Sequence, residues 1–158
     1  MLTRRITADD HSAVMKIAQA SDTALEAAEL TRDCARVWVA TDADQTVQGF
    51  LLAWAVADEL HLLNIVSAPA SRRRGVGRAL MQALLAFAAE NKARLVLLEV
   101  RRSNVAAIRL YRSSGFCAIG FRRGYYSDTG EDAVEMLATL DPISGQIEPG
   151  RDEIHLSL

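Results

Sequence analysis

Hydrophobic positions in the first half of the chain come in short apolar runs bounded by turn residues, a pattern that predicts β-strands. The predicted strands cover residues 2–6, 35–40, 49–57 and 59–67. Turn residues at 42–45 separate the second strand from the third. We expect the last three strands to form an antiparallel meander.

Two helices are predicted between the first two strands. Thr7 offers a hydroxyl cap, with Asp10 three residues further on, in a near capping-box arrangement. Val14, Ile17 and Ala18 then form an apolar stripe at helical spacing. The second helix is predicted over 22–32, because this stretch is rich in Ala, Leu and Glu.

In the second half, predicted helices and strands alternate. A helix opens near residue 76 and carries apolar residues at helical spacing: Val76, Leu80, Leu84 and Phe87. The continuous apolar run Leu95–Leu98 is typical of a strand buried on both faces. Ser103 or Asn104 would cap the next helix, which ends at Gly115. The last strands are predicted over 116–123 and 133–139.

This order of elements predicts the α/β class (mixed α+β), with a central mixed sheet flanked by helices in a single domain. A ligand is expected beyond the carboxyl end of the strand in the strand–loop–helix segment 59–91. Pattern-breaking residues follow the last strand: Pro142, Gly145, Pro149 and Gly150. We therefore predict one domain over residues 1–140 and a flexible C-terminal extension over 141–158.

Composition and charge exclude several classes of protein. Half of the residues are hydrophobic, 24% are charged and the formal net charge is −2, which argues against a disordered chain or a nucleic-acid-binding domain. Cys34 and Cys117 have no metal-ligand spacing, so we expect reduced thiols and no metal. No apolar run approaches the ~20 residues that a membrane helix needs. Residues 1–5 lead into no signal-peptide core, which predicts a cytoplasmic protein.

The strongest local signal is the stretch Arg72-x-x-Gly75-x-Gly77 between a strand and a helix. Glycines allow a ligand to approach the backbone, and the first N–H groups of a helix attract an anion. Arg73, Arg74 and Arg78 add positive charge, which suits a pyrophosphate. The stretch is neither a Walker loop nor a complete dinucleotide fingerprint. The alternative is a glycine-rich turn beside a solvated basic patch.

This loop resembles the cofactor loop of the GNAT superfamily, which reads Gln/Arg-x-x-Gly-x-Gly/Ala. Further segments are similar to the ribosomal-protein-alanine N-acetyltransferase family (RimI type) and cover most of Leu63–Met136. These segments are Leu63–Val66, Arg72–Leu80, Leu98–Asn104, Ala106–Phe116, Arg122–Tyr126 and Glu131–Ala133. The resemblance implies a GNAT fold and an acyltransferase that uses acetyl-CoA as co-substrate.

The resemblance also implies roles for single residues. Glu99 would be the general base, and Tyr111 would be the general acid that protonates the departing thiolate. Acetyl-CoA would contact Ile65, Val66, Ser67, Arg72, Arg73, Arg74, Gly75, Val76, Gly77, Arg78 and Asn104. The substrate groove would be lined by Arg122, Tyr125 and Tyr126.

Each of these residues also has a purely structural interpretation. Glu99 would then pair with Arg101 or Arg102 at the end of its strand. Tyr111 would be a core aromatic residue of an amphipathic helix, and Asn104 would be a plain helix cap. The segment 122–126 would be a basic and aromatic surface strand.

The chemistry of amines bears on the choice of substrate. A protein α-amino group titrates at about 8 and lysine at about 10.4, so the terminal amine needs less help from a base at neutral pH. The resemblance implies that the substrate is the N-terminal alanine of a small-subunit ribosomal protein. We expect a monomer or weak dimer without nucleic-acid or membrane partners. The alternatives are a GNAT enzyme acting on protein lysine or a small-molecule amine, and a catalytically silent acyl-CoA- or partner-binding module.

Overall fold

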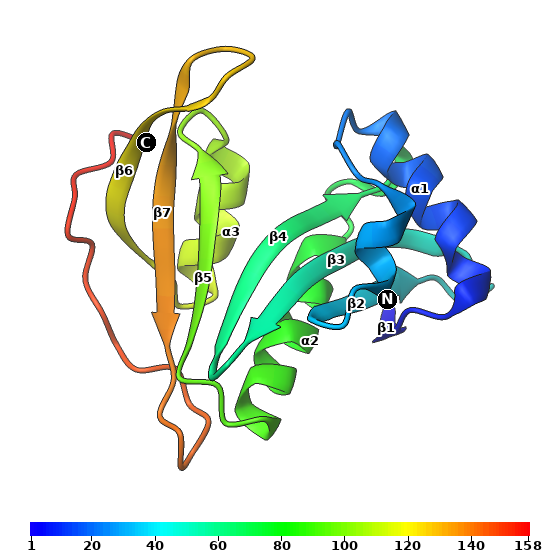
Figure 1. Cartoon of the computed structure of the whole chain (residues 1–158), viewed down its shortest axis with the longest axis horizontal. Coiled ribbons are helices and arrows are strands. Elements are labelled where there is room, and N and C mark those ends of the chain that lie inside the picture. The colour runs from blue at the N-terminus through cyan, green and yellow to red at the C-terminus, as the bar shows by residue number, and fades with distance from the viewer. The chain divides into compact units, whose positions relative to one another are not determined.

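The computed structural model describes residues 1–158, with seven strands and three α-helices. Contacts divide the chain into two units. The first unit comprises Met1–Val56 and Leu62–Phe87, and the second comprises Ala57–His61 and Ala88–Leu158. Figure 1 labels the elements of both units.

The strands of the first unit follow the order β1-β2-β3-β4 (Figure 1). They are β1 Leu2–Arg5, β2 Ala35–Thr41, β3 Val47–Val56 and β4 Glu59–Ser67, of which the residues from Leu62 onward belong to this unit. β2 pairs antiparallel with both β1 and β3, and Trp38 faces Leu51 across the second pair. The antiparallel pairing predicted for the first two strands of the meander, β2 and β3, is confirmed.

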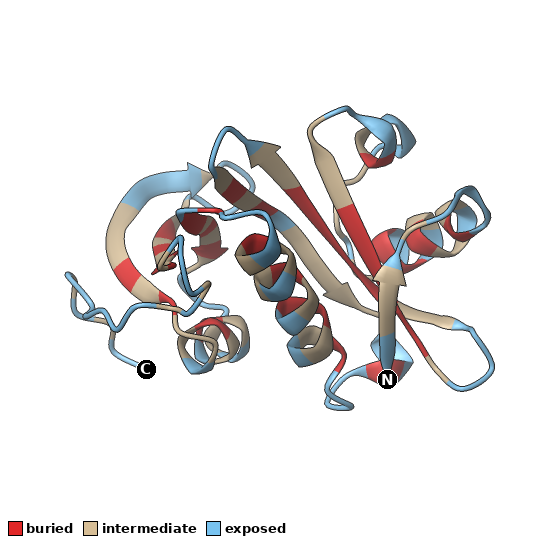
Figure 2. Ribbon diagram, turned by 90° about the horizontal axis from the view of Figure 1, so that it is seen from below, coloured by how far each residue is buried: buried red, intermediate tan, exposed pale blue.

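The helix α1, His11–Ala20, packs on this sheet with its apolar stripe inward. The 3-10 turn η1, Ala8–Asp10, precedes it and begins with the predicted capping box at Thr7. The core on this side consists of residues from the helix, from η2 and from the two central strands: Val14, Ile17, Ala18, Leu30, Val37, Val39, Phe50 and Leu52. Burial of each large apolar side chain stabilises the fold by roughly 1.5–3 kcal/mol. Figure 2 shows buried and exposed residues on opposite sides of the helices.

The prediction of a helix over residues 22–32 is wrong. The structure has only the short 3-10 segment η2, Ala27–Thr31, in this region. Asp22 has a φ of 52°, a left-handed conformation that an α-helix cannot continue through. Leu30 is the only buried residue of η2. Helices in proteins depend mainly on packing of an apolar face, so the helix propensity of Ala and Glu does not suffice here.

The helix α2, Val76–Glu90, confirms the helix predicted from the spacing of apolar residues. Val76, Leu80 and Leu84 are all buried. Phe87 meets Trp38 edge to face, with ring centroids 5.2 Å apart. The apolar stripe therefore anchors this helix in the core of the first unit.

In the second unit, the strands follow the order β5-β7-β6, and both neighbouring pairs are antiparallel. The elements are β5 Leu95–Arg101, α3 Val105–Ser113, β6 Cys117–Tyr126 and β7 Glu131–Thr139. α3 buries Ile108 and Tyr111. Gly115 follows the end of α3 with a φ of 102°, as the predicted helix end requires.

The C-terminal extension runs back along the second unit beside β6 (Figure 1). Ile147 forms a β-bridge with Leu140, and the Glu148 N–H donates to the Thr139 carbonyl at 2.8 Å. Further along, the Glu153 N–H donates to the Ala118 carbonyl at 2.8 Å. The division into a domain over 1–140 and a flexible extension stays a prediction.

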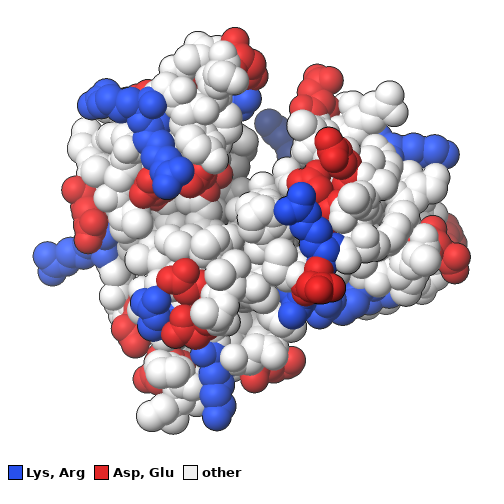
Figure 3. All heavy atoms as spheres, viewed as in Figure 1, with Lys and Arg blue, Asp and Glu red and all other residues white.

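The order of strands and helices confirms the predicted α/β class. No helix combines the length and the apolar character that crossing a membrane would require. Acidic and basic side chains are interspersed on the face shown in Figure 3. Acidic and basic side chains also form ion pairs, for example Arg94 with Asp58 and Glu59.

Candidate functional site

The predicted cofactor loop lies in the first unit, between β4 and α2. After β4 ends at Ser67, the 3-10 turn η3, Pro69–Ser71, leads into the loop. Arg73 and Gly75 have φ angles of 64° and 79°, in the left-handed region. A Cβ on Gly75 would meet no atom within 4 Å, so this position favours glycine because of its backbone conformation and not for lack of space.

The start of α2 presents backbone donors. The helix begins at Val76, and the first N–H groups of an α-helix have no partner within the helix. The helix dipole adds positive potential at this end. The neighbouring basic side chains are exposed: Arg72, Arg73, Arg74 and Arg78. This arrangement suits a pyrophosphate, and its occupation by one stays a prediction.

The end of β4 belongs to the same unit as the loop. Ile65, Val66 and Ser67 are half-buried, and the Ser67 carbonyl accepts a hydrogen bond from Ser21 Oγ at 3.5 Å. The first unit therefore contains all of the predicted cofactor contacts except Asn104.

Two residues of β3 that sequence reasoning missed hold both ends of the loop. The Gln48 carbonyl accepts from the Ala68 N–H at 2.8 Å, and its Oε1 accepts from Ser71 Oγ. A Cβ on Gly49 would lie 2.5 Å from Val76 Cγ1 and 2.7 Å from the Val66 carbonyl oxygen. The one sequence signal is the glycine inside a strand pattern, which marks close backbone approach.

Glu99 lies on β5 in the second unit, and its side chain is 29% exposed. Its ion-pair partner is Arg122, with Nη1 3.3 Å from Glu99 Oε1. The alternative pairing with Arg101 or Arg102 is wrong. The first of these pairs with Asp128 and Glu131 and the second with Asp132, so each has another carboxylate as its partner.

Tyr111 is 6% exposed and packs against Phe116, with ring centroids 5.9 Å apart. Burial raises the pKa of the Tyr111 phenol above its ordinary value, and the charge of Tyr126 adds to this effect. The phenol is therefore protonated throughout the physiological range, which is the form that a general acid needs. The core-aromatic interpretation holds as well, because the ring is part of the packing.

Tyr125 and Tyr126 interact electrostatically with the two proposed catalytic residues, Glu99 and Tyr111. The neighbouring Glu99 carboxylate, first as a hydrogen-bond acceptor, raises the pKa of the Tyr125 phenol. Burial first, and the charge of Glu99 among smaller effects, raise the pKa of Tyr126, whose charge also acts on Tyr111. The two tyrosine rings meet edge to face at 5.0 Å. The second unit therefore brings Glu99, Tyr111 and the predicted substrate residues into one electrostatic group.

Asn104 caps α3, as the structural interpretation predicted. Its Oδ1 accepts a hydrogen bond from the Ala107 N–H at 3.2 Å. This bond occupies one lone pair of the amide oxygen and leaves the NH₂ group available to a ligand. The role toward the cofactor stays a prediction.

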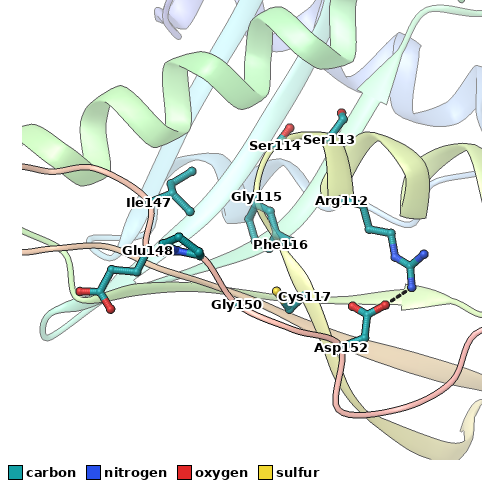
Figure 4. Close-up of a pocket in the computed structure, with 11 residues that line it drawn as sticks. Arg112, Ser113, Ser114, Gly115, Phe116, Cys117, Ile147, Glu148, Gly150 and Asp152 are labelled. Atoms are coloured by element: carbon teal, nitrogen blue, oxygen red, sulfur yellow. Dashed lines mark hydrogen bonds and ion pairs between the residues drawn. The ribbon is translucent and has the colours of Figure 1, made fainter.

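The second unit also contains a cavity of about 650 Å³ between the extension and the end of α3 (Figure 4). Gly115, Phe116 and Cys117 line one side, and Ile147 and Gly150 line the other. Arg112 and Asp152 form an ion pair at its edge. None of the predicted site residues lines this cavity, so its shape does not bear on the proposed chemistry.

Comparison with known proteins finds similar sequences among acetyltransferases. The model of the Acetyltransferase (GNAT) family matches residues 4–116. A Bacillus subtilis protein provisionally named as a ribosomal protein bS18-alanine N-acetyltransferase is 34% identical over 66% of this chain and 69% of its own length. The Escherichia coli ribosomal protein bS18-alanine N-acetyltransferase is 43% identical over 58% of this chain and 63% of its own length. The matched stretch thus spans about two thirds of each relative.

Solved structures agree with this similarity. The ribosomal-protein-S18-alanine N-acetyltransferase from Escherichia coli has a TM-score of 0.78 and 30% identity, over 86% of this chain and 91% of that chain. A provisionally named streptothricin acetyltransferase from Bacillus anthracis, solved in complex with acetyl coenzyme A, has a TM-score of 0.73 over 89% of this chain and 98% of that chain. Its 18% identity shows the fold alone. Together with the family match, these comparisons show that the chain belongs to the acetyltransferase (GNAT) family and resembles its RimI-type members.

Proposed function

We propose that this acetyltransferase moves the acetyl group of acetyl-CoA to the N-terminal α-amino group of a protein. The proposed substrate is the N-terminal alanine of a small-subunit ribosomal protein. The observation that carries this proposal is the similarity to bS18-alanine N-acetyltransferases along most of the folded chain. A cytoplasmic monomer or weak dimer, without a nucleic-acid partner, completes the proposal.

The first unit would hold the co-substrate. The donors at the start of α2 and the exposed arginines suit the pyrophosphate of coenzyme A. The backbone of Ile65–Ser67 suits the pantetheine arm, which can add to a strand end by main-chain hydrogen bonds. When bound, acetyl-CoA supplies a thioester carbonyl, which the unprotonated amine can attack.

The second unit would supply the proton transfers. Glu99 is partly exposed and can accept the proton of the attacking amine, directly or through a water molecule. Tyr111 is held protonated and can return a proton to the departing sulfur. Tyr125 is 47% exposed next to Glu99. We propose that Tyr125, Tyr126 and Arg122 line the groove for the substrate's first residues.

The test uses one peptide that begins with alanine and contains an internal lysine. After incubation with acetyl-CoA, mass spectrometry locates the added acetyl group. We expect it on the terminal amine alone. Modification of the lysine alone would instead identify the lysine-directed alternative, and acetyl-CoA binding without turnover on any amine would identify a silent binding module.

The roles of the two residues are tested by Glu99→Gln and Tyr111→Phe. Loss of a general base or acid lowers kcat by about 10²–10⁴-fold, and we expect losses in this range for both variants. Glu59→Gln is the control, because Glu59 is another strand glutamate that accepts a hydrogen bond from an arginine. Native kcat in both variants would remove the assigned acid and base.

A further inference from the structure

Two carboxylates face each other directly in the sheet of the second unit. Glu99 on β5 and Glu135 on β7 are register partners. Their side chains are similarly half-buried, at 29% and 31% exposed. Like charges directly opposite each other on one face of a sheet are destabilising, so this arrangement requires a cation nearby.

Arg122 on β6 supplies that cation, and its guanidinium contacts the two carboxylates unequally. Its Nε donates a hydrogen bond to Glu135 Oε1 at 2.7 Å, whereas its Nη1 lies 3.3 Å from Glu99 Oε1. The pKa of Arg122 is raised, first by the hydrogen bond to Glu135 and then by the charge of Glu99. Both observations place the guanidinium primarily with Glu135.

The pairing of β6 with β7 explains how Arg122 reaches this position. Gly120 faces Glu135 across the pair, and Arg122 lies two residues further along β6, on the same face of the strand. Gly120 has no side chain, and a Cβ there would be 3.8 Å from Glu135 Oε2. The space above the carboxylate is therefore open to the diagonal neighbour Arg122.

The unequal pairing of Arg122 affects how readily Glu99, the proposed base, can bind a proton. A carboxylate in a close, two-bonded pair with a guanidinium has both oxygens occupied and binds a proton less readily. We propose that Glu135 is a positioning residue for the acetyl transfer, because it holds Arg122 and so keeps Glu99 out of a close, two-bonded guanidinium pair that would weaken it as a proton acceptor. This inference rests on the proposed function of Glu99 as the base.

The test is an epistasis measurement on kcat, with alanine peptide and acetyl-CoA both at saturation. We expect Glu135→Gln to lower kcat about tenfold, because the released Arg122 then pairs with Glu99. The double variant Glu135→Gln/Arg122→Met removes the competing cation and is expected to recover most of this loss in kcat, while its KM for the peptide rises because Arg122 is also proposed to line the substrate groove. A purely structural role of Glu135 would give a double variant that is no better than the single one.

Glu59→Gln is the matched control, since its side chain is 27% exposed and it accepts a hydrogen bond from Arg94 at 2.9 Å. If Glu135→Gln does not fold, Glu135→Asp replaces it, because the shortened carboxylate also loosens its hold on Arg122. Turnover by the native enzyme tests the proposed function separately. With that turnover present, a full kcat in the Glu135 variant, or a loss that Arg122→Met does not relieve, would overturn the inference.

Discussion

The buried carboxylate of Asp10 makes the stability of the fold depend on pH. Its two carboxylate oxygens accept hydrogen bonds from Arg4 Nη1 and Nη2 at 2.6 and 2.9 Å, and Oδ2 also accepts from the Thr7 N–H at 2.8 Å. The hydrogen bonds from Arg4, and smaller contributions from Thr7, lower the pKa of Asp10 from 3.8 to about 2. A lowered pKa in the folded state adds stability above the unfolded value, and this stability disappears as the pH falls toward 2.

We therefore predict that Asp10→Asn lowers the free energy of unfolding by about 2 kcal/mol at pH 7. The difference from the native protein should shrink between pH 4 and pH 2, where the native carboxyl becomes protonated. Urea unfolding at three pH values measures it. Asp9→Asn, at the neighbouring exposed position, should change stability by less than about 0.5 kcal/mol. An Asp10 variant with the same deficit at every pH would contradict the assigned cause.

Single residues of the candidate site differ in how far sequence reveals them. Glu99 and Tyr111 belong to local motifs, so they can be assigned roles before the fold is known. Glu135 could not be selected, because its significance comes from facing Glu99 across two strands that are more than thirty residues apart in the chain. The pairing of Glu99 with Arg122 was missed for the same reason, since sequence proximity favoured Arg101 and Arg102.

At the scale of elements, the loop between β4 and α2 depends on close packing against β3. A Cβ on Gly49 would overlap with Val76 at the start of α2 and with the carbonyl of Val66 at the end of β4. Neither is a flexible side-chain end: one is the branched Cγ of a buried valine and the other is backbone. An added methyl group must therefore move the elements that frame the predicted cofactor site.

We predict that Gly49→Ala weakens acetyl-CoA binding about tenfold, with a loss of about 1–3 kcal/mol in stability from overpacking. Calorimetry measures the Kd, and thermal unfolding shows whether the variant is folded at the assay temperature. Gly120→Ala is the control, because a Cβ there makes only an ordinary contact at 3.8 Å. Native affinity in a folded Gly49→Ala would show that the loop does not depend on this packing.

Strands and long helices could be predicted because their patterns agree with their packing. β4 has the predicted bounds, and α2 buries Val76, Leu80 and Leu84, which were identified from their spacing. The stretch 22–32 was mispredicted, since its composition favours a helix while only Leu30 of η2 is buried. Composition alone does not show which residues have a core to pack against.

At the scale of the whole molecule, the predicted site residues are distributed over both units. The loop and the end of β4 lie in the first unit, whereas Glu99 and Tyr111 lie in the second. The C-terminal extension contacts the rest of the second unit through Ile147, which lies against Gly115, and through Gly150. A Cβ on Gly150 would be 2.9 Å from Cys117 Sγ, so the extension covers this half-buried thiol.

The thiol of Cys117 can therefore report whether the extension is held or flexible. In a Cys34→Ser background, we predict that removal of residues 141–158 raises the rate of thiol labelling about tenfold, because the covering backbone is lost and local opening is no longer required. Removal of 154–158 alone leaves the Glu153–Ala118 hydrogen bond and should keep the native rate. Labelling of the intact chain as fast as the truncated one would instead support the flexible extension predicted from its prolines and glycines, because contacts that open this readily do not protect a thiol.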